Sequence, residues 1–164
     1  MRKELPVQKN RIAIIGCGNP FMGNDGAGYL TMQALEGRCP GVDCIDGGTG
    51  GFGLIPLMEE YERVVIVDAM TGIGDRIGDV VILETPPVHA HPACSLHDIG
   101  VGEAVAVARE LGHAGEIVVV GIEAGEIRAF TREVDPAVRE GIRVAGEHIL
   151  RIIGEWADDA GRGA

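Results

Sequence analysis

Short apolar runs alternate along this chain with segments of helical periodicity, and this alternation strongly limits the folds open to the chain. The runs are rich in Ile and Val and mostly continuous, as in strands that are covered on both faces of a sheet. They occupy residues 11–16, 42–45, 63–67, 79–83 and 116–120. The order predicts an α/β fold: a three-layer sandwich in which helices cover both faces of a twisted, mainly parallel sheet of five strands.

Helical signals fill most of the segments between these runs. Helices are predicted at residues 26–36, 52–60 and 98–111, and a last helix begins with Asp135 as N-cap and Pro136 as first residue. In the third helix the expected buried positions are Val101, Ala104, Val105, Ala108 and Leu111. In the last helix they are Val138, Ile142, Ala145, Ile149, Ile152 and Trp156.

One strand is expected to run against the others. Only about ten residues separate the run at 79–83 from the run before it, and a parallel crossover needs a dozen or more. We therefore expect one antiparallel strand in the sheet. No linker or repeat divides the chain, so we expect a single domain over residues 1–164, with an ordered core at about 10–157 and a loose tail from about Asp158.

The charge balance excludes some partners. Asp and Glu number 25 against 14 Lys and Arg, a formal charge of −11, which disfavours nucleic acid and anionic membrane surfaces. The first apolar run, Ile12 to Ile15, is too short for a signal peptide or a membrane span. We expect a cytoplasmic monomer whose four cysteines, none in a C-x-x-C pair, are free thiols.

Three polar residues are expected to meet at one edge of the sheet. Ligands bind outside the carboxyl ends of parallel strands. Asp25 lies in the glycine-rich loop after the first strand, Asp68 ends the third, and His97 follows the long connection that returns to this edge. Two carboxylates and a neutral imidazole are a plausible ligand set for a divalent metal with open positions, so these residues are the predicted metal-binding and catalytic groups.

Other interpretations of these residues stay open. Asn24 or Asp25 could cap the helix that follows, and Asp68 could be a turn former. The run His89, His91, Cys94 and His97 contains zinc-type ligands, although its spacing matches no structural zinc pattern. Gly16-x-Gly18 is a partial dinucleotide fingerprint in which Phe21 occupies the third glycine position.

At these residues the sequence resembles the hydrogenase maturation endopeptidase family. The resemblance begins with Gly18-Asn19-x-x-Met22-Gly23-Asn24-Asp25-Gly26-x-Gly28. It continues through Asp46-Gly47-Gly48-Thr49, Val67-Asp68-Ala69, His97 in Ser95-Leu96-His97-Asp98, and Gly121-Ile122-Glu123. Order and spacing agree from about Ile12 to Leu150. Two positions depart from the family pattern: Asp25 stands where some members carry Glu, and Asn24 stands where Asp is usual.

The resemblance implies a specific activity. Members of the family remove a C-terminal extension from the large-subunit precursor of a [NiFe] hydrogenase after nickel has been inserted. Their metal-binding positions fall on Asp25, Asp68 and His97, where the nickel arrives with the substrate and zinc or cadmium can replace it in the isolated protein. The turn from Asp46 through Gly47 and Gly48 to Thr49 is implied to bind substrate.

Several points of mechanism and function stay open. The metal could polarise the scissile carbonyl or activate a water, and Asp46 could orient the tail or act as a base. No dedicated nucleophile is evident, so no acyl-enzyme is expected. The alternatives to a dedicated endopeptidase are a non-catalytic metal-sensing chaperone for the nickel-loaded subunit and a peptidase of broad substrate range.

Overall fold

The computed structural model describes residues 11–84 and 100–162. The strands are β1 (Ile12–Gly16), β2 (Val42–Asp46), β3 (Arg63–Met70), β4 (Val80–Leu83) and β5 (Glu116–Glu123). The helices are α1 (Ala27–Leu35), α2 (Leu54–Glu59), α3 (Val101–Glu110) and α4 (Pro136–Arg162). Short 3₁₀ turns, η1 (Gly23–Gly26) and η2 (Gly51–Gly53), precede α1 and α2.

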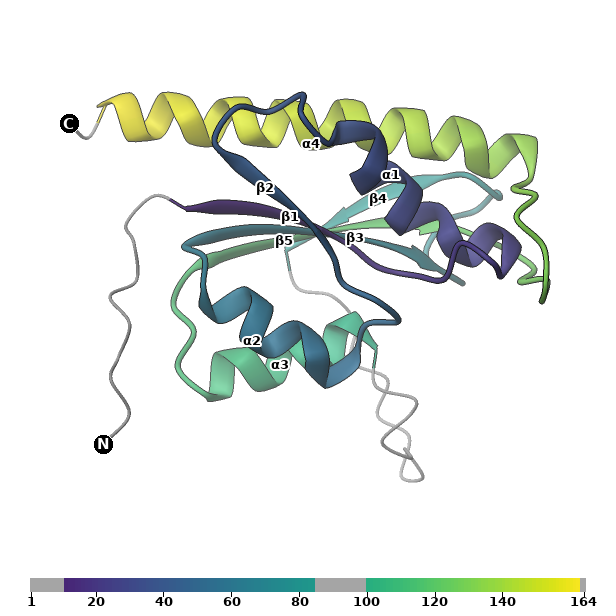
Figure 1. Ribbon diagram of the computed structural model, residues 1–164, viewed down its shortest axis with the longest axis horizontal. Coiled ribbons are helices and arrows are strands. Elements are labelled where there is room, and N and C mark those ends of the chain that lie inside the picture. The colour runs from purple at the N-terminus through teal and green to yellow at the C-terminus, as the bar shows by residue number, and fades with distance from the viewer. Residues whose placement is uncertain (1–10, 85–99, 163–164) are drawn as a thin grey trace.

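The three-layer α/β architecture expected from the sequence is confirmed. The five strands form one sheet in the order β2-β1-β3-β5-β4, with α1 and α4 over one face and α2 and α3 over the other (Figure 1). β1, β2, β3 and β5 are parallel, and β4 is antiparallel to β5. Among the helices of the described residues, none is long and apolar enough to cross a membrane.

Burial on both faces explains why the inner strands are continuously apolar. Along β3, Val64 and Ile66 pack into the cluster beneath α2 and α3, whereas Val65 and Val67 pack into the cluster beneath α1 and α4. All four side chains are fully buried. Each such side chain contributes roughly 1.5–3 kcal/mol to the free energy of folding, so this strand is a rigid base for the residues at its carboxyl end.

The expected antiparallel strand is present as β4, at the sheet edge beside β5. β5 lies between β3 and β4. It pairs with β3 in parallel over the whole length of both strands, from Arg63 opposite Glu116 to Met70 opposite Glu123. β3 and β5 are therefore longer than the apolar runs that predicted them. The extension matters for the site because it places Asp68 inside a paired strand, opposite Gly121, instead of in a free turn.

Three local expectations are wrong. α4 continues to Arg162, so no loose tail begins near Asp158. Leu111 is 65% exposed because α3 ends at Glu110 and the next residue turns away from the core. α1 has no side-chain cap; its N-cap is Gly26, and the Asp25 carboxylate is engaged elsewhere.

A glycine lets α1 pack directly on the ends of two strands. A Cβ added at Gly28 would overlap the carbonyl oxygens of Cys17 and Val67, which are backbone atoms that cannot move aside. The same change at Gly154, on the exposed side of α4, would meet nothing within 4 Å.

We therefore expect opposite effects from two Gly→Ala substitutions in helices. Gly28→Ala should lower the free energy of unfolding by about 1–3 kcal/mol through overpacking. Gly154→Ala should raise it by about 0.5–1 kcal/mol because alanine favours the helix. Urea titrations of both variants measure the difference, and a neutral result for Gly28→Ala would contradict the tight contact.

Candidate functional site

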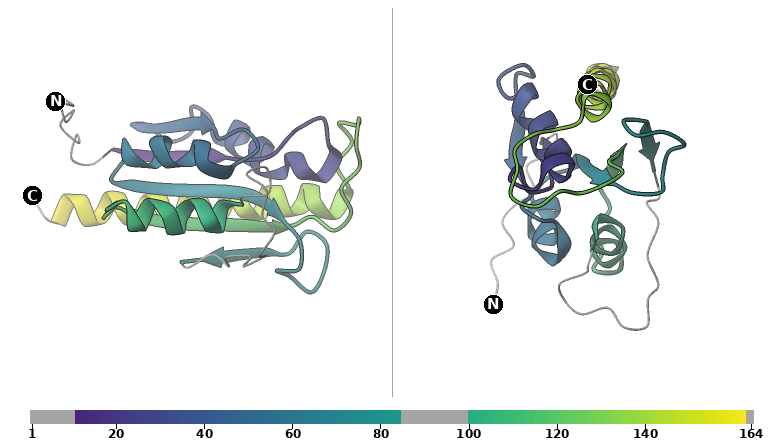
Figure 2. Two further views of the ribbon diagram at one scale, coloured as in Figure 1. Left: turned by 90° about the horizontal axis from the view of Figure 1, so that it is seen from below. Right: turned by 90° about the vertical axis from the view of Figure 1, so that its right-hand side faces the viewer.

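Asp25 and Asp68 line one cavity at the carboxyl edge of the sheet. The cavity has a volume of about 450 Å³ and is bordered by residues 68–73, by the start of α3 from Gly100 to Glu103, and by Ala124 and Ile127. It lies where the connections of β1 and β3 diverge to opposite sides, which is the usual ligand position in an open α/β sheet. The right panel of Figure 2 faces this edge.

Backbone hydrogen bonds hold the two carboxylates in place. The pairing of β1 with β3 continues one residue past the strand, because Cys17 N donates to Val67 O at 2.8 Å. The chain then turns at Gly18, whose φ of 112° suits glycine and where a Cβ would overlap the Asp25 carbonyl oxygen. The returning Asp25 carboxylate accepts a hydrogen bond from Asn19 N at 2.9 Å.

The surroundings of Asp68 disfavour its charged form. Burial and, to a smaller extent, the negative charge of Asp25 raise the pKa of Asp68 to about 7, while a hydrogen bond from the Ala69 backbone opposes the shift. A divalent cation between the two carboxylates would relieve their repulsion and replace the lost hydration. The donor set of two carboxylate oxygens at one cavity therefore fits a divalent metal ion.

Cys17 is surrounded by the same negative charges. Burial raises the pKa of its thiol well above the ordinary value, and the charges of Asp68, Asp46 and Asp25 raise it further. The thiol is thus held neutral within the core cluster under α2 and α3. A neutral buried thiol is a poor nucleophile, so Cys17 is a packing residue.

The third expected ligand, His97, lies outside the described residues, as does the alternative ligand run from His89 to His97. Within residues 11–84 and 100–162, no group of three or more His, Cys, Asp and Glu side chains could hold a metal ion. The start of α3 at Gly100 borders the cavity that contains Asp25 and Asp68. The structure therefore brings two of the three predicted residues together.

A second depression is lined by the loop between β1 and η1, together with residues of α1 and of the turn after β2. This groove, with a volume of about 630 Å³, is lined by Gly18, Asn19, Pro20, Phe21, Tyr29, Leu30, Gln33, Asp46, Gly48, Thr49 and Arg132. Asp46 Oδ1 accepts a hydrogen bond from Gly48 N at 2.8 Å, which shapes the turn. Three of the four residues predicted to bind substrate thus line the groove, whereas Gly47 packs inward against Ile15 and Cys17.

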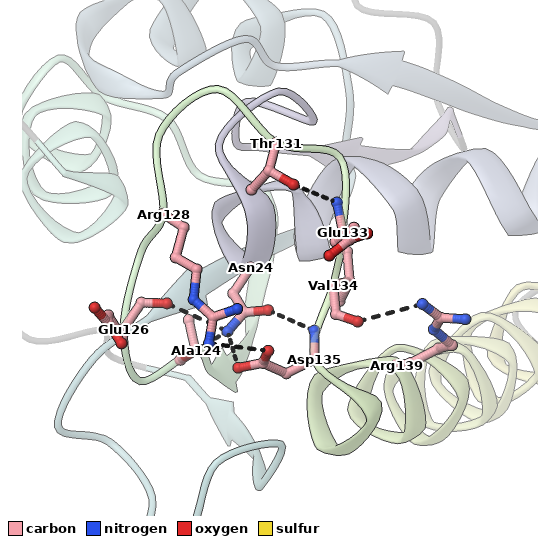
Figure 3. A network of polar contacts seen from close by, with 9 residues as sticks. All are labelled: Asn24, Ala124, Glu126, Arg128, Thr131, Glu133, Val134, Asp135 and Arg139. Carbon is pink, nitrogen blue, oxygen red and sulfur yellow. Dashed lines mark hydrogen bonds and ion pairs between the residues drawn. The ribbon is translucent and has the colours of Figure 1, made fainter.

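Asn24 is a site residue whose partners could not be found from the sequence. Its buried side-chain amide donates to Ala124 O and to Asp135 Oδ2, both at 2.9 Å, and more weakly to Glu126 O (Figure 3). Its oxygen accepts from Asp135 N at 2.9 Å. These bonds tie the residue next to Asp25 to the start of α4 and to the segment 124–135. The sequence marked Asn24 only as a candidate helix cap and as a departure from the family's usual Asp.

Glu123 supports the opposite wall of the cavity. Although burial acts to raise its pKa, backbone N–H groups of Gly74, Ile73, Gly125 and Gly72 outweigh that effect and hold the pKa below its ordinary value. Ile73 N donates at 2.8 Å and Gly74 N at 3.0 Å. Glu123 therefore anchors the turn after β3 that borders Asp68.

The Asn24 network predicts that the family's usual residue is harmful in this chain. Asn24→Asp removes the donors to two carbonyl groups and places a second carboxylate beside Asp135. We expect a loss of about 2–4 kcal/mol in the free energy of unfolding at pH 8, measured by urea titration. The loss should shrink at pH 5, because protonation of the new carboxyl restores a donor. Gln33→Glu, an exposed amide-to-acid change, is the matched control and should have little effect.

Because the pKa of Asp68 is raised, replacing its carboxyl group should increase the stability of the folded protein at high pH more than at low pH. The folded pKa of about 7 lies above the unfolded value, so the stability that this group contributes is present at low pH and is lost as the pH rises towards 7. The change in the free energy of unfolding caused by Asp68→Asn in the metal-free protein should therefore be more favourable at pH 8 than at pH 4, by about 2 kcal/mol or more. Exposed Asp75→Asn is the control. An equal effect of Asp68→Asn at both pH values would contradict the shift.

Comparisons with known proteins agree with this architecture. The family model described as "HycI: Hydrogenase maturation protease" matches residues 31–152. The hydrogenase 2 maturation protease of Escherichia coli (strain K12) is 27% identical over 156 residues, covering 92% of this chain and 94% of that protein. The hydrogenase expression/formation protein HupD of Bradyrhizobium diazoefficiens is 27% identical over 156 residues, covering 91% of this chain and 81% of that protein.

Solved structures show the same likeness. The hydrogenase maturating endopeptidase HybD from E. coli superposes with a TM-score of 0.72 at 26% identity, covering 88% of this chain and 93% of that chain. The [NiFe] hydrogenase maturation protease HycI from Thermococcus kodakarensis gives a TM-score of 0.70 at 25% identity, covering 90% and 96%. Because the family model spans more than half of its residues, this chain belongs to the hydrogenase maturation protease family.

Proposed function

We propose that this protein is an endopeptidase that removes the C-terminal extension of a [NiFe] hydrogenase large-subunit precursor once nickel has been inserted. Asp25 and Asp68 offer their carboxylates to the nickel that the substrate carries, and His97 is the expected third ligand. The reaction is hydrolysis: water adds across one peptide bond, the large subunit keeps the new C-terminal carboxylate, and the tail leaves as a free peptide with a new amino terminus.

The observation that carries this proposal is the convergence of Asp25 and Asp68 in one cavity of a hydrogenase maturation protease fold. Neither carboxylate has a cationic side chain as an ion-pair partner among the described residues. A pair of unpaired carboxylates is costly unless a cation arrives, so the site discriminates between a precursor with nickel and one without it. Recognition of the metal thus reports that nickel insertion is complete.

The surface beside the two depressions suits a folded protein substrate. Three large apolar side chains are exposed: Ile127 of the cavity at 38%, Phe21 of the groove at 54%, and Phe130, on the segment between β5 and α4, at 98%. Phe130 also has a φ of 59°, a left-handed conformation that non-glycine residues rarely adopt. Exposed large apolar side chains mark protein interaction sites, which supports docking of the large subunit on this part of the surface.

Asp46 fits a role in shaping the substrate groove better than a role as base. One of its oxygens accepts the Gly48 N–H at 2.8 Å, and the residue lines the groove rather than the cavity that contains Asp25 and Asp68. A general base must lie within hydrogen-bond reach of the attacking water. We infer that Asp46 holds the turn against which the tail lies.

The direct test is a cleavage assay on a purified precursor, with tail loss followed by mass spectrometry. The wild-type protein should cleave the nickel-loaded precursor and leave the nickel-free form intact. Asp25→Asn and Asp68→Asn keep the shape of each side chain but remove its charge, and each should slow cleavage by at least about a hundredfold. His97→Ala should do the same, and Asp75→Asn, which removes an exposed charge outside both depressions, should cleave at the wild-type rate.

The alternatives correspond to different outcomes of this assay. If the protein binds the nickel-loaded precursor but the precursor keeps its tail, the protein is a metal-sensing chaperone and not an endopeptidase. If the protein cleaves nickel-loaded and nickel-free precursors equally, or cleaves unrelated peptides, it is a peptidase of broad substrate range that does not recognise the metal.

A further inference from the structure

Arg132 is a cation that the site described so far does not use. Its guanidinium carbon lies 4.2 Å from the centre of the Phe21 ring, and both residues line the groove beside Asp46. Within residues 11–84 and 100–162, Arg132 makes no ion pair, although the chain carries 25 acidic residues. Arg128, four residues earlier on the same segment, does pair, with Asp135 at 3.7 Å.

The backbone holds Arg132 in place over the groove. Its neighbour Thr131 forms an isolated parallel bridge with Met22: Thr131 N donates to Phe21 O at 2.9 Å, and Gly23 N donates to Thr131 O at 2.8 Å. The Asn24 network ties both ends of the segment 124–135 to the same loop (Figure 3). Arg132 therefore extends from a segment that is fixed on each side.

The position of Arg132 against Phe21, in a groove with apolar walls, suits a carboxylate on a peptide. The centre of the Phe21 ring lies 4.2 Å from the guanidinium carbon, and the N–H groups of a planar guanidinium form a fork that matches a carboxylate. Phe21, Tyr29, Leu30 and Pro20 give the groove apolar walls. A volume of about 630 Å³ is within the range of ligand pockets and is large enough for a short peptide segment.

The groove adjoins the cavity of Asp25 and Asp68. Asn19 lines the groove, and its N–H donates to the Asp25 carboxylate at 2.9 Å. A chain bound with its scissile bond near Asp25 could continue across this loop into the groove.

We propose that this groove binds the segment of the precursor that is cut off, with Arg132, stacked on Phe21, receiving a carboxylate of that tail. This inference rests on the proposed endopeptidase function. The carboxylate is either an acidic side chain of the tail or the α-carboxylate at its end, and both present the same two oxygens to the guanidinium. Arg132 is thus a specificity residue, since it contacts the leaving peptide and not the bond that breaks.

The test compares three tails on the nickel-loaded precursor: the native tail, a tail whose Asp and Glu are changed to Asn and Gln, and a semisynthetic tail that ends in an amide. Wild-type protein should show an increase in KM of about tenfold or more for whichever change removes the contacted carboxylate, with kcat unchanged. That result also identifies the source of the carboxylate. Equal KM values for all three tails would overturn the proposal.

Arg132→Gln should raise KM for the native tail by a similar factor, and the sensitive tail change should then have no further effect. Arg128→Gln removes the same charge from the same segment outside the groove, and it should respond to the tails as the wild type does. If Arg132→Gln stays as sensitive to the tail change as the wild type, Arg132 is not the receptor. Equal melting temperatures of the two variants and the wild type show that the comparison concerns folded protein.

A binding measurement separates this inference from the proposed function. Three synthetic tail peptides, native, with Asp and Glu changed to Asn and Gln, and with an amide at the end, are titrated into wild-type protein and Arg132→Gln while the backbone amides of Asn19 and Gly48 are followed by NMR. Weaker shifts with one of the two altered peptides than with the native peptide, in the wild type only, would support the groove even if the protein cleaved no precursor. Cleavage of the nickel-loaded precursor together with peptide shifts that are equal in both proteins would sustain the endopeptidase and overturn the role of Arg132.

Discussion

The hydrogen bond from Cys17 N to Val67 O, at 2.8 Å, joins the two halves of the site. It extends the β1–β3 pairing beyond the last residue of β1, so the loop that carries Asp25 begins against the residue that precedes Asp68. Gly18 and Gly28 allow this arrangement because the backbones of loop, helix and strand approach too closely for any Cβ. Two carboxylates are thereby placed at one cavity by backbone packing, before any metal or substrate is considered.

Two carboxylates at one buried site repel each other, and neighbouring hydrogen bonds hold the backbone around them in place. Asp68 loses hydration and faces Asp25, which raises its pKa to about 7. Glu123 fixes the turn next to Asp68 through backbone N–H groups, and Asn24 fixes the residue before Asp25 without adding another charge. Hydrogen bonds thus hold the backbone on both sides of the two carboxylates, which is the preorganised arrangement expected of a cation site.

Much of this could be predicted from the sequence, because strand order and direction follow from apolar runs and connection lengths. The convergence of Asp25 and Asp68 follows from such topology alone, since Asp25 lies in the loop after β1 and Asp68 lies near the carboxyl end of β3. The pairing partner of β4 could not be predicted, because it depends on β5, which comes later in the chain. The N-cap expectation for Asp25 failed because the carboxylate turns back to Asn19 N instead of forward to the helix.

The contacts between distant segments were also beyond sequence reasoning. Asn24 and Asp135 are 111 positions apart, and nothing in their local patterns connects them. Arg132 and Phe21 are similarly distant, and each alone is an ordinary surface residue. His97 lies outside the described residues and remains a prediction. Family membership and the positions of Asp25 and Asp68 together support the endopeptidase account without it.

The most direct test of the account is calorimetric titration of cadmium ions into the metal-free protein at pH 7 in buffers of different ionisation enthalpy. If Asp25 and Asp68 close around a divalent cation, cadmium should bind and displace the proton that Asp68 partly holds at this pH, so the measured enthalpy should depend on the buffer. Asp68→Asn should weaken binding and reduce that proton release. Equally tight binding to Asp25→Asn, Asp68→Asn and the wild type would contradict the claim that these two carboxylates form the metal-recognition site.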